Sequence, residues 1–204
     1  MSTLITGISE LRTVSELGTI KDAALLIDDG VVAWVGRADE APAEASNAET
    51  VDVGNRAVLP GWVDSHTHMV FDGNRAEEFE ARMAGESYAA GGIAVTMEAT
   101  RSAGEERLDQ LVAERVAAAH ALGTTTFETK TGYGLNVESE AEAARVASRH
   151  VDEVTFLGAH LVPPGEEADE YLEQVVGPML DAVKDHVQWI DVFCERGAFD
   201  EAQS

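Results

Sequence analysis

Short apolar runs separated by turn residues make up the first quarter of the chain. Two such runs, Ala24–Ile27 and Val31–Gly36, flank an Asp-Asp-Gly turn, and an Asp-Gly step between β-forming runs is a strong hairpin signal. The Ala-, Glu- and Pro-rich segment 38–50 lacks apolar periodicity and predicts a polar connector with little regular structure. Val51–Val53 then predicts a further strand. The pattern therefore predicts strands and turns for residues 1–55.

From Ala57 onward, apolar strand-like runs alternate with segments of helical periodicity. This alternation is typical of a parallel sheet whose strands are joined by crossover helices, so we expect an α/β fold. After an opening strand in the stretch 57–68, the predicted strands are Thr124–Lys130, Val154–Leu157 and Val187–Cys194. The predicted helices are Glu77–Met83, Glu105–Leu122, Ser139–Arg149 and Asp169–Asp185, the last interrupted at Gly177-Pro178.

Two of the predicted helices carry signals at their ends. Ser102 and Glu105 have the spacing of a capping box, in which each side chain bonds the other residue's backbone N–H. Glu142 stands at the same distance after Ser139. Gly123 follows the first of these helices, and glycine readily adopts the left-handed conformation that ends a helix. These residues predict where both helices begin and where the first one ends.

Two histidines one residue apart close the 57–68 stretch. Successive side chains of a strand alternate between its faces, so we expect His66, His68 and Asp64 to point the same way. Two neighbouring imidazoles at the end of a strand make half of a metal site. Asp64 is a candidate to hold one imidazole in a single tautomer. The alternative is a hydrogen-bonded histidine pair in the core.

Polar residues also follow the later strands. They are Lys130 with Tyr133 just beyond it, His160, and Glu195. In a (β/α)8 barrel the carboxyl ends of the strands carry the chemistry, so their common position indicates one site. Lys130 suits an ion pair, with a carboxylated lysine that bridges two metal ions as the alternative, and we assign no step to Glu195. The remaining histidines are expected to be structural: His120, His150 and His186.

The net charge argues against two classes of binding partner. The chain has 38 acidic and 14 basic residues, a net charge of −24, which repels nucleic acid and anionic membrane surfaces. We therefore expect neither as a partner. The lysines are only three, Lys21, Lys130 and Lys184, and this scarcity favours a halophile's protein, because high salt screens self-repulsion. The alternative is an ordinary acidic cytosolic protein.

Cysteine content and hydropathy bear on compartment. The single cysteine, Cys194, excludes an internal disulfide and a cysteine-based zinc cluster. It lies in the apolar run Trp189–Cys194, which predicts a small buried side chain. The N-terminus lacks the pattern of a secretory leader, and no apolar run approaches the ~18 residues of a membrane span. We therefore expect a cytoplasmic protein.

Several ordered motifs resemble a known enzyme family. Pro60-Gly61-x-x-Asp64-x-His66-x-His68 resembles the first barrel strand of the amidohydrolase superfamily. Later stretches are similar to motifs of the imidazolonepropionase family, which opens a ring in histidine breakdown: Phe71–Arg75, Glu78–Arg82, Lys130–Asn136, Leu157–Pro164 and Asp191–Glu195. The resemblance covers the chain from about Val51 to its last residue.

This resemblance implies a two-part α/β fold. Residues 57–204 would form strands 1–4 of a metal-dependent (β/α)8 barrel of the TIM type. Residues 1–56 would be the N-terminal part of a small β domain that flanks the barrel. A complete barrel takes about 250 residues, so we expect this chain to contain half of one.

The resemblance also implies an activity. It is hydrolysis of the cyclic amide C–N bond of 4-imidazolone-5-propanoate to N-formimidoyl-L-glutamate, with one zinc or iron ion that activates water and polarises the carbonyl. His66 and His68 would be metal ligands. Arg75 would bind the substrate carboxylate, and Tyr133 and His160 would contact the substrate. The other ligands and a catalytic glutamate are expected beyond Ser204. The resemblance further implies a homodimer.

Alternatives remain open at each of these residues. Arg75 suits a surface salt bridge, Tyr133 a packed aromatic ring in a turn, and His160 a hydrogen-bonded core histidine. For the chain as a whole, the alternatives are another cyclic-amide hydrolase or deaminase of the superfamily, and an inactive product of a split gene.

Overall fold

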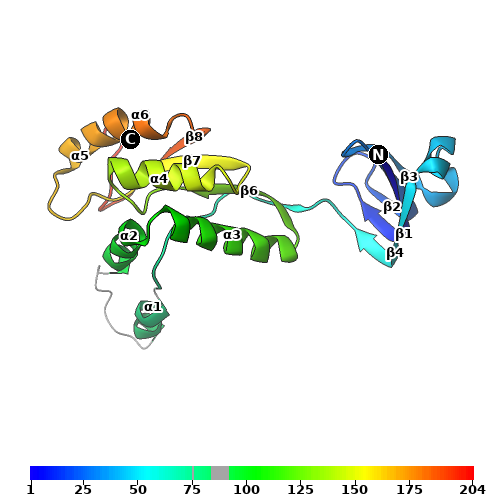
Figure 1. Cartoon of the computed structure of the whole chain (residues 1–204), viewed down its shortest axis with the longest axis horizontal. Coiled ribbons are helices and arrows are strands. Elements are labelled where there is room, and N and C mark those ends of the chain that lie inside the picture. The colour runs from blue at the N-terminus through cyan, green and yellow to red at the C-terminus, as the bar shows by residue number, and fades with distance from the viewer. Residues whose placement is uncertain (75, 84–91) are drawn as a thin grey trace. The chain divides into compact units, whose positions relative to one another are not determined.

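The computed structural model describes residues 1–74, 76–83 and 92–204 and divides into two compact units, Met1–Gly61 and Trp62–Ser204 (Figure 1). Each unit has its own sheet of four strands. No helix in the described part of the chain combines the length and the apolar character that crossing a membrane requires.

The first unit is a mixed sheet in the order β3-β2-β1-β4. Its strands and two short 3₁₀ helices are β1 (Ser2–Arg12), β2 (Thr19–Asp28), β3 (Val31–Arg37), η1 (Ala38–Glu40), η2 (Ala43–Asn47) and β4 (Glu49–Val58). β2 runs antiparallel to β1 and β3, whereas β4 runs parallel to β1. Its main apolar cluster contains the buried residues Ile8, Leu11, Ala23 and Leu25.

The predicted hairpin is confirmed. β2 and β3 pair across Asp29 and Gly30, whose φ values of 47° and 79° are the positive values that a type I′ turn requires. Ala23 to Leu26 is buried at every position, so this apolar run lies in a strand covered on both faces.

Two expectations for this unit were wrong. The segment 38–50 contains η1 and η2 and the start of β4 instead of an unstructured connector. Gly54 and Asn55 do not end a strand: both have positive φ and form an irregularity within β4, which continues to pair with β1 as far as Val58. The first compact unit extends from Met1 to Gly61.

The second unit is a parallel sheet in the order β5-β6-β7-β8. Its elements are β5 (Trp62–Asp64), α1 (Ala76–Met83), α2 (Gly92–Ala103), α3 (Glu105–Ala121), β6 (Thr124–Lys130), α4 (Val137–Ala147), β7 (Glu153–Ala159), α5 (Ala168–Gln174), the π-helical segment η3 (Val175–Met179), α6 (Leu180–Val183) and β8 (Trp189–Val192). Strand order follows chain order, which is the arrangement of the first half of a (β/α)8 barrel. The predicted alternation and the predicted parallel sheet are confirmed.

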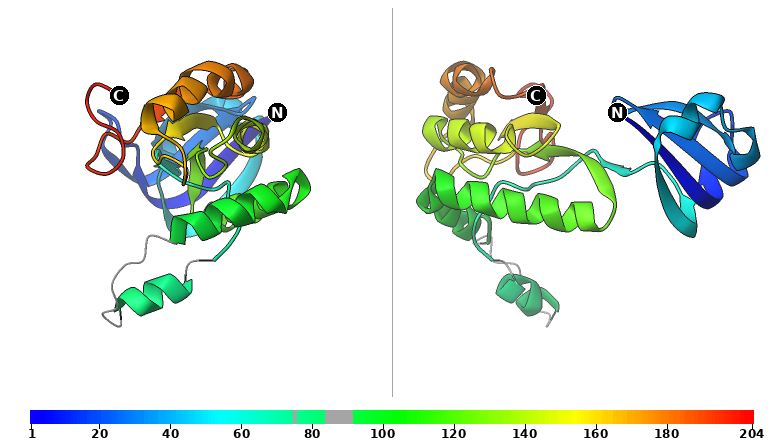
Figure 2. Two further views of the ribbon diagram at one scale, coloured as in Figure 1. Left: turned by 90° about the vertical axis from the view of Figure 1, so that its left-hand side faces the viewer. Right: turned by 45° about the vertical axis from the view of Figure 1, so that its right-hand side comes forward.

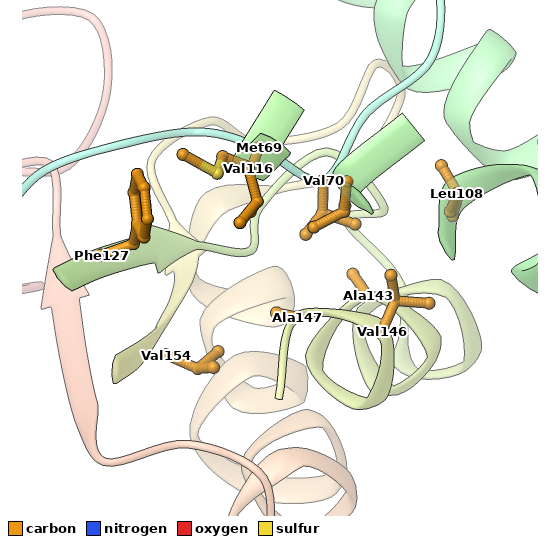
Figure 3. Packing of buried hydrophobic residues seen from close by; sticks show 10 residues of the cluster. Met69, Val70, Leu108, Val116, Phe127, Ala143, Val146, Ala147 and Val154 are labelled. Carbon is orange, nitrogen blue, oxygen red and sulfur yellow. The ribbon is translucent and has the colours of Figure 1, made fainter. Parts of the chain in front are cut away.

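The helices α3, α4 and α6 lie side by side over one face of this sheet (Figures 1 and 2). Phe127 of β6 and Val154 of β7 point to that face and pack with Val112 of α3 and Val146 of α4; Figure 3 shows this cluster. A second cluster joins Phe156 of β7 to α4, α5 and α6. This packing fixes the strands side by side and leaves their opposite face for the polar residues.

Two helix starts differ from the predicted capping boxes. α2 extends to Ala103 and takes in Ser102, so Ser102 cannot cap Glu105; Gly104, with φ 73°, occupies the N-cap of α3 without a side-chain hydrogen bond. α4 begins earlier than expected because Asn136 caps it, accepting a hydrogen bond from the Ser139 N–H at 2.8 Å.

Three further expectations have clear outcomes. Gly123, with φ 98°, ends α3 as predicted. Gly177, with φ −106° and ψ −105°, interrupts the helical segment before Pro178, also as predicted. The expectation of a buried cysteine was wrong: β8 ends at Val192, and Cys194 is exposed in the segment that follows.

Candidate active site

The histidine pair lies just beyond the carboxyl end of β5. The His66 and His68 ring centroids are 5.4 Å apart with an interplanar angle of 63°. Asp64 does not share their surroundings: it lines a separate hollow with Val63 and Ser65, and its described hydrogen bond is from the backbone N–H of His66 at 3.4 Å. The chain turns after β5, so strand alternation no longer governs these side chains. The expectation that Asp64 points with the imidazoles and fixes one of them is not supported.

Thr67, between the two histidines, is bound tightly to β6. Its N–H donates to Glu128 Oε2 at 3.1 Å, its hydroxyl donates to the Glu128 carbonyl at 2.6 Å, and its carbonyl accepts from the Lys130 N–H at 2.9 Å. The Met69 N–H donates to the Thr129 hydroxyl at 2.9 Å. This ladder holds the peptide that carries both imidazoles against the end of the neighbouring strand.

Three of the predicted site residues meet in one cavity of about 540 Å³. His66 and His68, just beyond β5, and His160, just beyond β7, line it together. The other lining residues are Leu157, Leu161, Asp191, Val192, Phe193, Arg196, Gly197 and Ala198. Three histidines from the carboxyl ends of two different strands therefore lie around one cavity.

Burial lowers the pKa of His68, and the nearness of His66, His160 and Lys130 lowers it further. A lowered pKa favours the neutral imidazole at neutral pH. The neutral ring is the form that binds a metal.

Lys130 forms the predicted ion pair, with two acidic partners. Its ammonium lies 2.9 Å from Glu128 Oε1 and 3.3 Å from Asp191 Oδ2, and its side chain is 6% exposed. Neither carboxylate was identified from the sequence. Glu128 shares a strand face with Lys130, which was an available signal, whereas the Asp191 contact needs β8 to lie within reach.

Tyr133 lies in the loop after β6, on the side of the histidines. Its ring centroid is 5.8 Å from that of His68, 5.6 Å from that of Phe71 and 6.5 Å from that of His160. The carbonyl of Gly132 accepts a hydrogen bond from His160 Nε2. The structure therefore brings Tyr133 and His160 together near the histidine pair. Arg75, the predicted carboxylate ligand, lies outside the described residues.

The other predicted structural histidines are engaged elsewhere. His120 Nδ1 bonds the Thr124 carbonyl at 2.8 Å, and His150 Nε2 lies 2.9 Å from Asp109 Oδ1. Glu195 is exposed, and its carboxylate accepts the N–H of Arg196 at 2.8 Å.

The donor set suits part of a metal site. Two imidazoles side by side are the ligands that zinc and iron favour, and a catalytic zinc usually has three protein ligands. Within the described residues, no group of three or more His, Cys, Asp or Glu side chains is placed to hold an ion. His66 and His68 therefore fit a metal as two of its ligands.

The chain is closely similar to several curated proteins, and no family model matches it. It is 60% identical over its whole length to an imidazolonepropionase from Micrococcus luteus, of which it covers 51%, and 60% identical to one from Paenarthrobacter aurescens, of which it covers 49%. An imidazolonepropionase from Saccharopolyspora erythraea is 59% identical, with 52% covered. The chain thus spans about half the length of these relatives.

Solved structures support the fold. A guanine deaminase from C. acetobutylicum matches with a TM-score of 0.56 at 16% identity, covering 94% of this chain and 46% of that one. A Xaa-Pro dipeptidase also matches with a TM-score of 0.56, at 15% identity, covering 94% and 47%. At such low identity the likeness concerns the fold alone, and it agrees with a small β unit followed by half of an α/β barrel.

Proposed function

We propose that this chain supplies the first half of the active site of an imidazolonepropionase. The observation that carries the proposal is the cavity in which His66, His68 and His160 meet, in a chain 60% identical throughout to proteins of that name. The reaction is hydrolysis of 4-imidazolone-5-propanoate. Water adds to the ring carbonyl, the amide C–N bond breaks, and the ring nitrogen takes a proton to give N-formimidoyl-L-glutamate.

His66 and His68 would hold the metal, zinc or iron. When bound, such an ion activates water and polarises a carbonyl. The protein's own contribution is to hold the two imidazoles together through the hydrogen bonds of Thr67 and to favour the neutral form of His68 through its lowered pKa.

His160 and Tyr133 would orient the imidazolone ring. A carbonyl can only accept, so the Gly132 carbonyl assigns a proton to His160 Nε2 and leaves Nδ1 as the nitrogen for a ligand. The propanoate needs a planar pair of donors, and Arg75 is proposed for it because a guanidinium binds a carboxylate through two parallel N–H bonds.

The remaining expectations extend the same proposal. The complete enzyme would be a homodimer, as the resemblance implies, and cytoplasmic, as expected from the pattern of its sequence. The net charge of −24 supports a salt-rich cytoplasm, where self-repulsion is screened.

The experiment is turnover of 4-imidazolone-5-propanoate by the complete gene product, with dihydroorotate and cytosine as competing substrates and metal content measured in parallel. We expect hydrolysis of the imidazolone alone, and loss of both metal and turnover in His66→Ala and His68→Ala. His150→Ala is the matched control, because His150 bonds Asp109 away from the cavity. Turnover of dihydroorotate or cytosine without the imidazolone would favour another member of the superfamily.

A further inference from the structure

A buried carboxylate lies directly behind the loop that carries Tyr133. Glu140, in the first turn of α4, is 0% exposed. None of the ion pairs within residues 1–74, 76–83 and 92–204 involves Glu140, although a buried charge is very unfavourable unless it is well hydrogen-bonded. Its position therefore calls for strong hydrogen-bond donors.

Those donors are three backbone N–H groups of one loop. Glu140 Oε2 accepts from Gly132 at 2.9 Å, and Oε1 accepts from Gly134 and Leu135 at 2.8 Å each. Hydrogen bonds to a charged acceptor are about twice as strong as neutral ones. The loop 131–136 is thus wound around the carboxylate.

The conformation of this loop needs such support. Leu135 has φ 50°, an unfavourable value for a side chain larger than glycine, and its own side chain is 2% exposed. A Cβ on Gly132 would lie 2.6 Å from the Leu157 carbonyl oxygen and 3.0 Å from the His160 ring. The backbone must therefore pass very close to β7 and His160.

The backbone carbonyls of this loop are hydrogen-bonded as well. Arg101 of α2 donates to the Gly134 carbonyl at 2.6 Å and to the Leu135 carbonyl at 3.1 Å. The Gly132 carbonyl accepts from His160 Nε2. The two ends of the Tyr133 peptide segment are therefore both fixed, one through Glu140 and His160 and the other through Glu140 and Arg101.

We infer that Glu140 is a positioning residue for substrate binding. It touches neither substrate nor metal; it holds the backbone that places Tyr133 and, through the Gly132 carbonyl, sets the orientation and tautomer of His160. This inference rests on the proposed function, because it takes Tyr133 and His160 as the substrate contacts. The sequence pattern gave no sign of it, since a glutamate in the first turn of a helix ordinarily faces solvent.

The test is Glu140→Gln in the complete gene product. The amide keeps the volume but has one acceptor oxygen instead of two and no charge, so at least one loop N–H loses its partner. We expect the KM for 4-imidazolone-5-propanoate to rise about tenfold or more, with kcat changing less and the metal content unaltered. Glu138→Gln, the same change at an exposed position in the same helix turn, should leave KM unchanged.

A KM for Glu140→Gln equal to that of Glu138→Gln would overturn the inference. If Glu140→Gln does not fold, Glu140→Asp decides, because it keeps the charge and draws the carboxylate back from the three N–H groups. A raised KM in Glu140→Asp supports the inference, and an unaltered one overturns it. Absence of turnover in the wild-type protein would contradict the proposed function instead. The ¹⁵N shifts of His160 would then decide for Glu140. They must change in Glu140→Gln if the hydrogen bond from the Gly132 N–H to this carboxylate positions the carbonyl that accepts from His160.

Discussion

Glu128→Gln removes the negative charge that faces Lys130 inside the sheet and keeps the shape of the side chain. The two side chains are 11% and 6% exposed, and Glu128 Oε1 lies 2.9 Å from Lys130 Nζ. The carboxylate also accepts the Thr67 N–H through its second oxygen. An amide has only one oxygen, so the variant leaves either the ammonium or the backbone N–H opposite an NH2 group.

The expected loss follows from this geometry. At 2.9 Å the attraction between unit charges is about 6 kcal/mol for an effective dielectric constant of ~20, and desolvation offsets much of it. Removing one partner of a buried pair costs about 3–5 kcal/mol. Asp191, whose Oδ2 lies 3.3 Å from Lys130 Nζ and whose side chain is 43% exposed, still offsets part of the ammonium charge. We therefore expect the free energy of unfolding to fall by about 2–4 kcal/mol.

The assay is urea unfolding of the complete gene product, followed by tryptophan fluorescence. Asp181→Asn is the matched control: it removes the same charge from a pair with Lys184, 2.8 Å apart but 74% and 57% exposed, and should leave the midpoint unchanged. Adding Lys130→Met to Glu128→Gln should recover most of the loss, because it removes the unpaired buried charge.

The metal offers a second readout. Since Glu128 anchors the peptide between His66 and His68, we expect metal affinity to fall about tenfold in Glu128→Gln. The reasoning is refuted if Glu128→Gln unfolds at the same urea concentration as Asp181→Asn and retains its metal equally well.

Four further outcomes are expected. Arg75→Lys should weaken substrate binding by about 1–3 kcal/mol, because it keeps the charge and loses the paired donors; an unaltered kcat/KM in Arg75→Ala would make Arg75 a surface residue. Tyr133→Phe and His160→Ala should impair turnover at full metal content, and loss of metal in either would place that residue among the ligands. Far-UV circular dichroism should show loss of structure as salt falls from molar to about 0.1 M, where the screening length grows from ~3 to ~10 Å; an unchanged spectrum removes the argument for a halophile. Residues 1–204 expressed alone should aggregate and bind metal weakly, since Trp62 and Trp189, on the outermost strands of the parallel sheet, are 62% and 60% exposed; tight stoichiometric metal with turnover would contradict this.

Local pattern was enough for most of the strands and for part of the site. The β-branched run Thr124–Lys130 is β6 residue for residue, and the Asp-Gly turn joins β2 to β3 as predicted. The histidine spacing, with the carboxyl-end rule for parallel strands, also predicted that His66, His68 and His160 would meet. Hydrophobic periodicity and turn residues depend only on neighbours in the chain. In this sheet the strand order follows the chain order, so these local signals also indicate which strands lie side by side.

The tertiary structure decided which polar groups are buried and what satisfies them. Ser102 has the spacing of a helix cap but lies inside α2, and Glu140 looks like a surface glutamate but is enclosed by the loop 131–136. Lys130 contacts Asp191, which is distant in sequence, only because β8 pairs with β7. The physical reason is that a charge is stable inside a protein only with partners that arrive from elsewhere in the sequence, and no local pattern records where those partners will be.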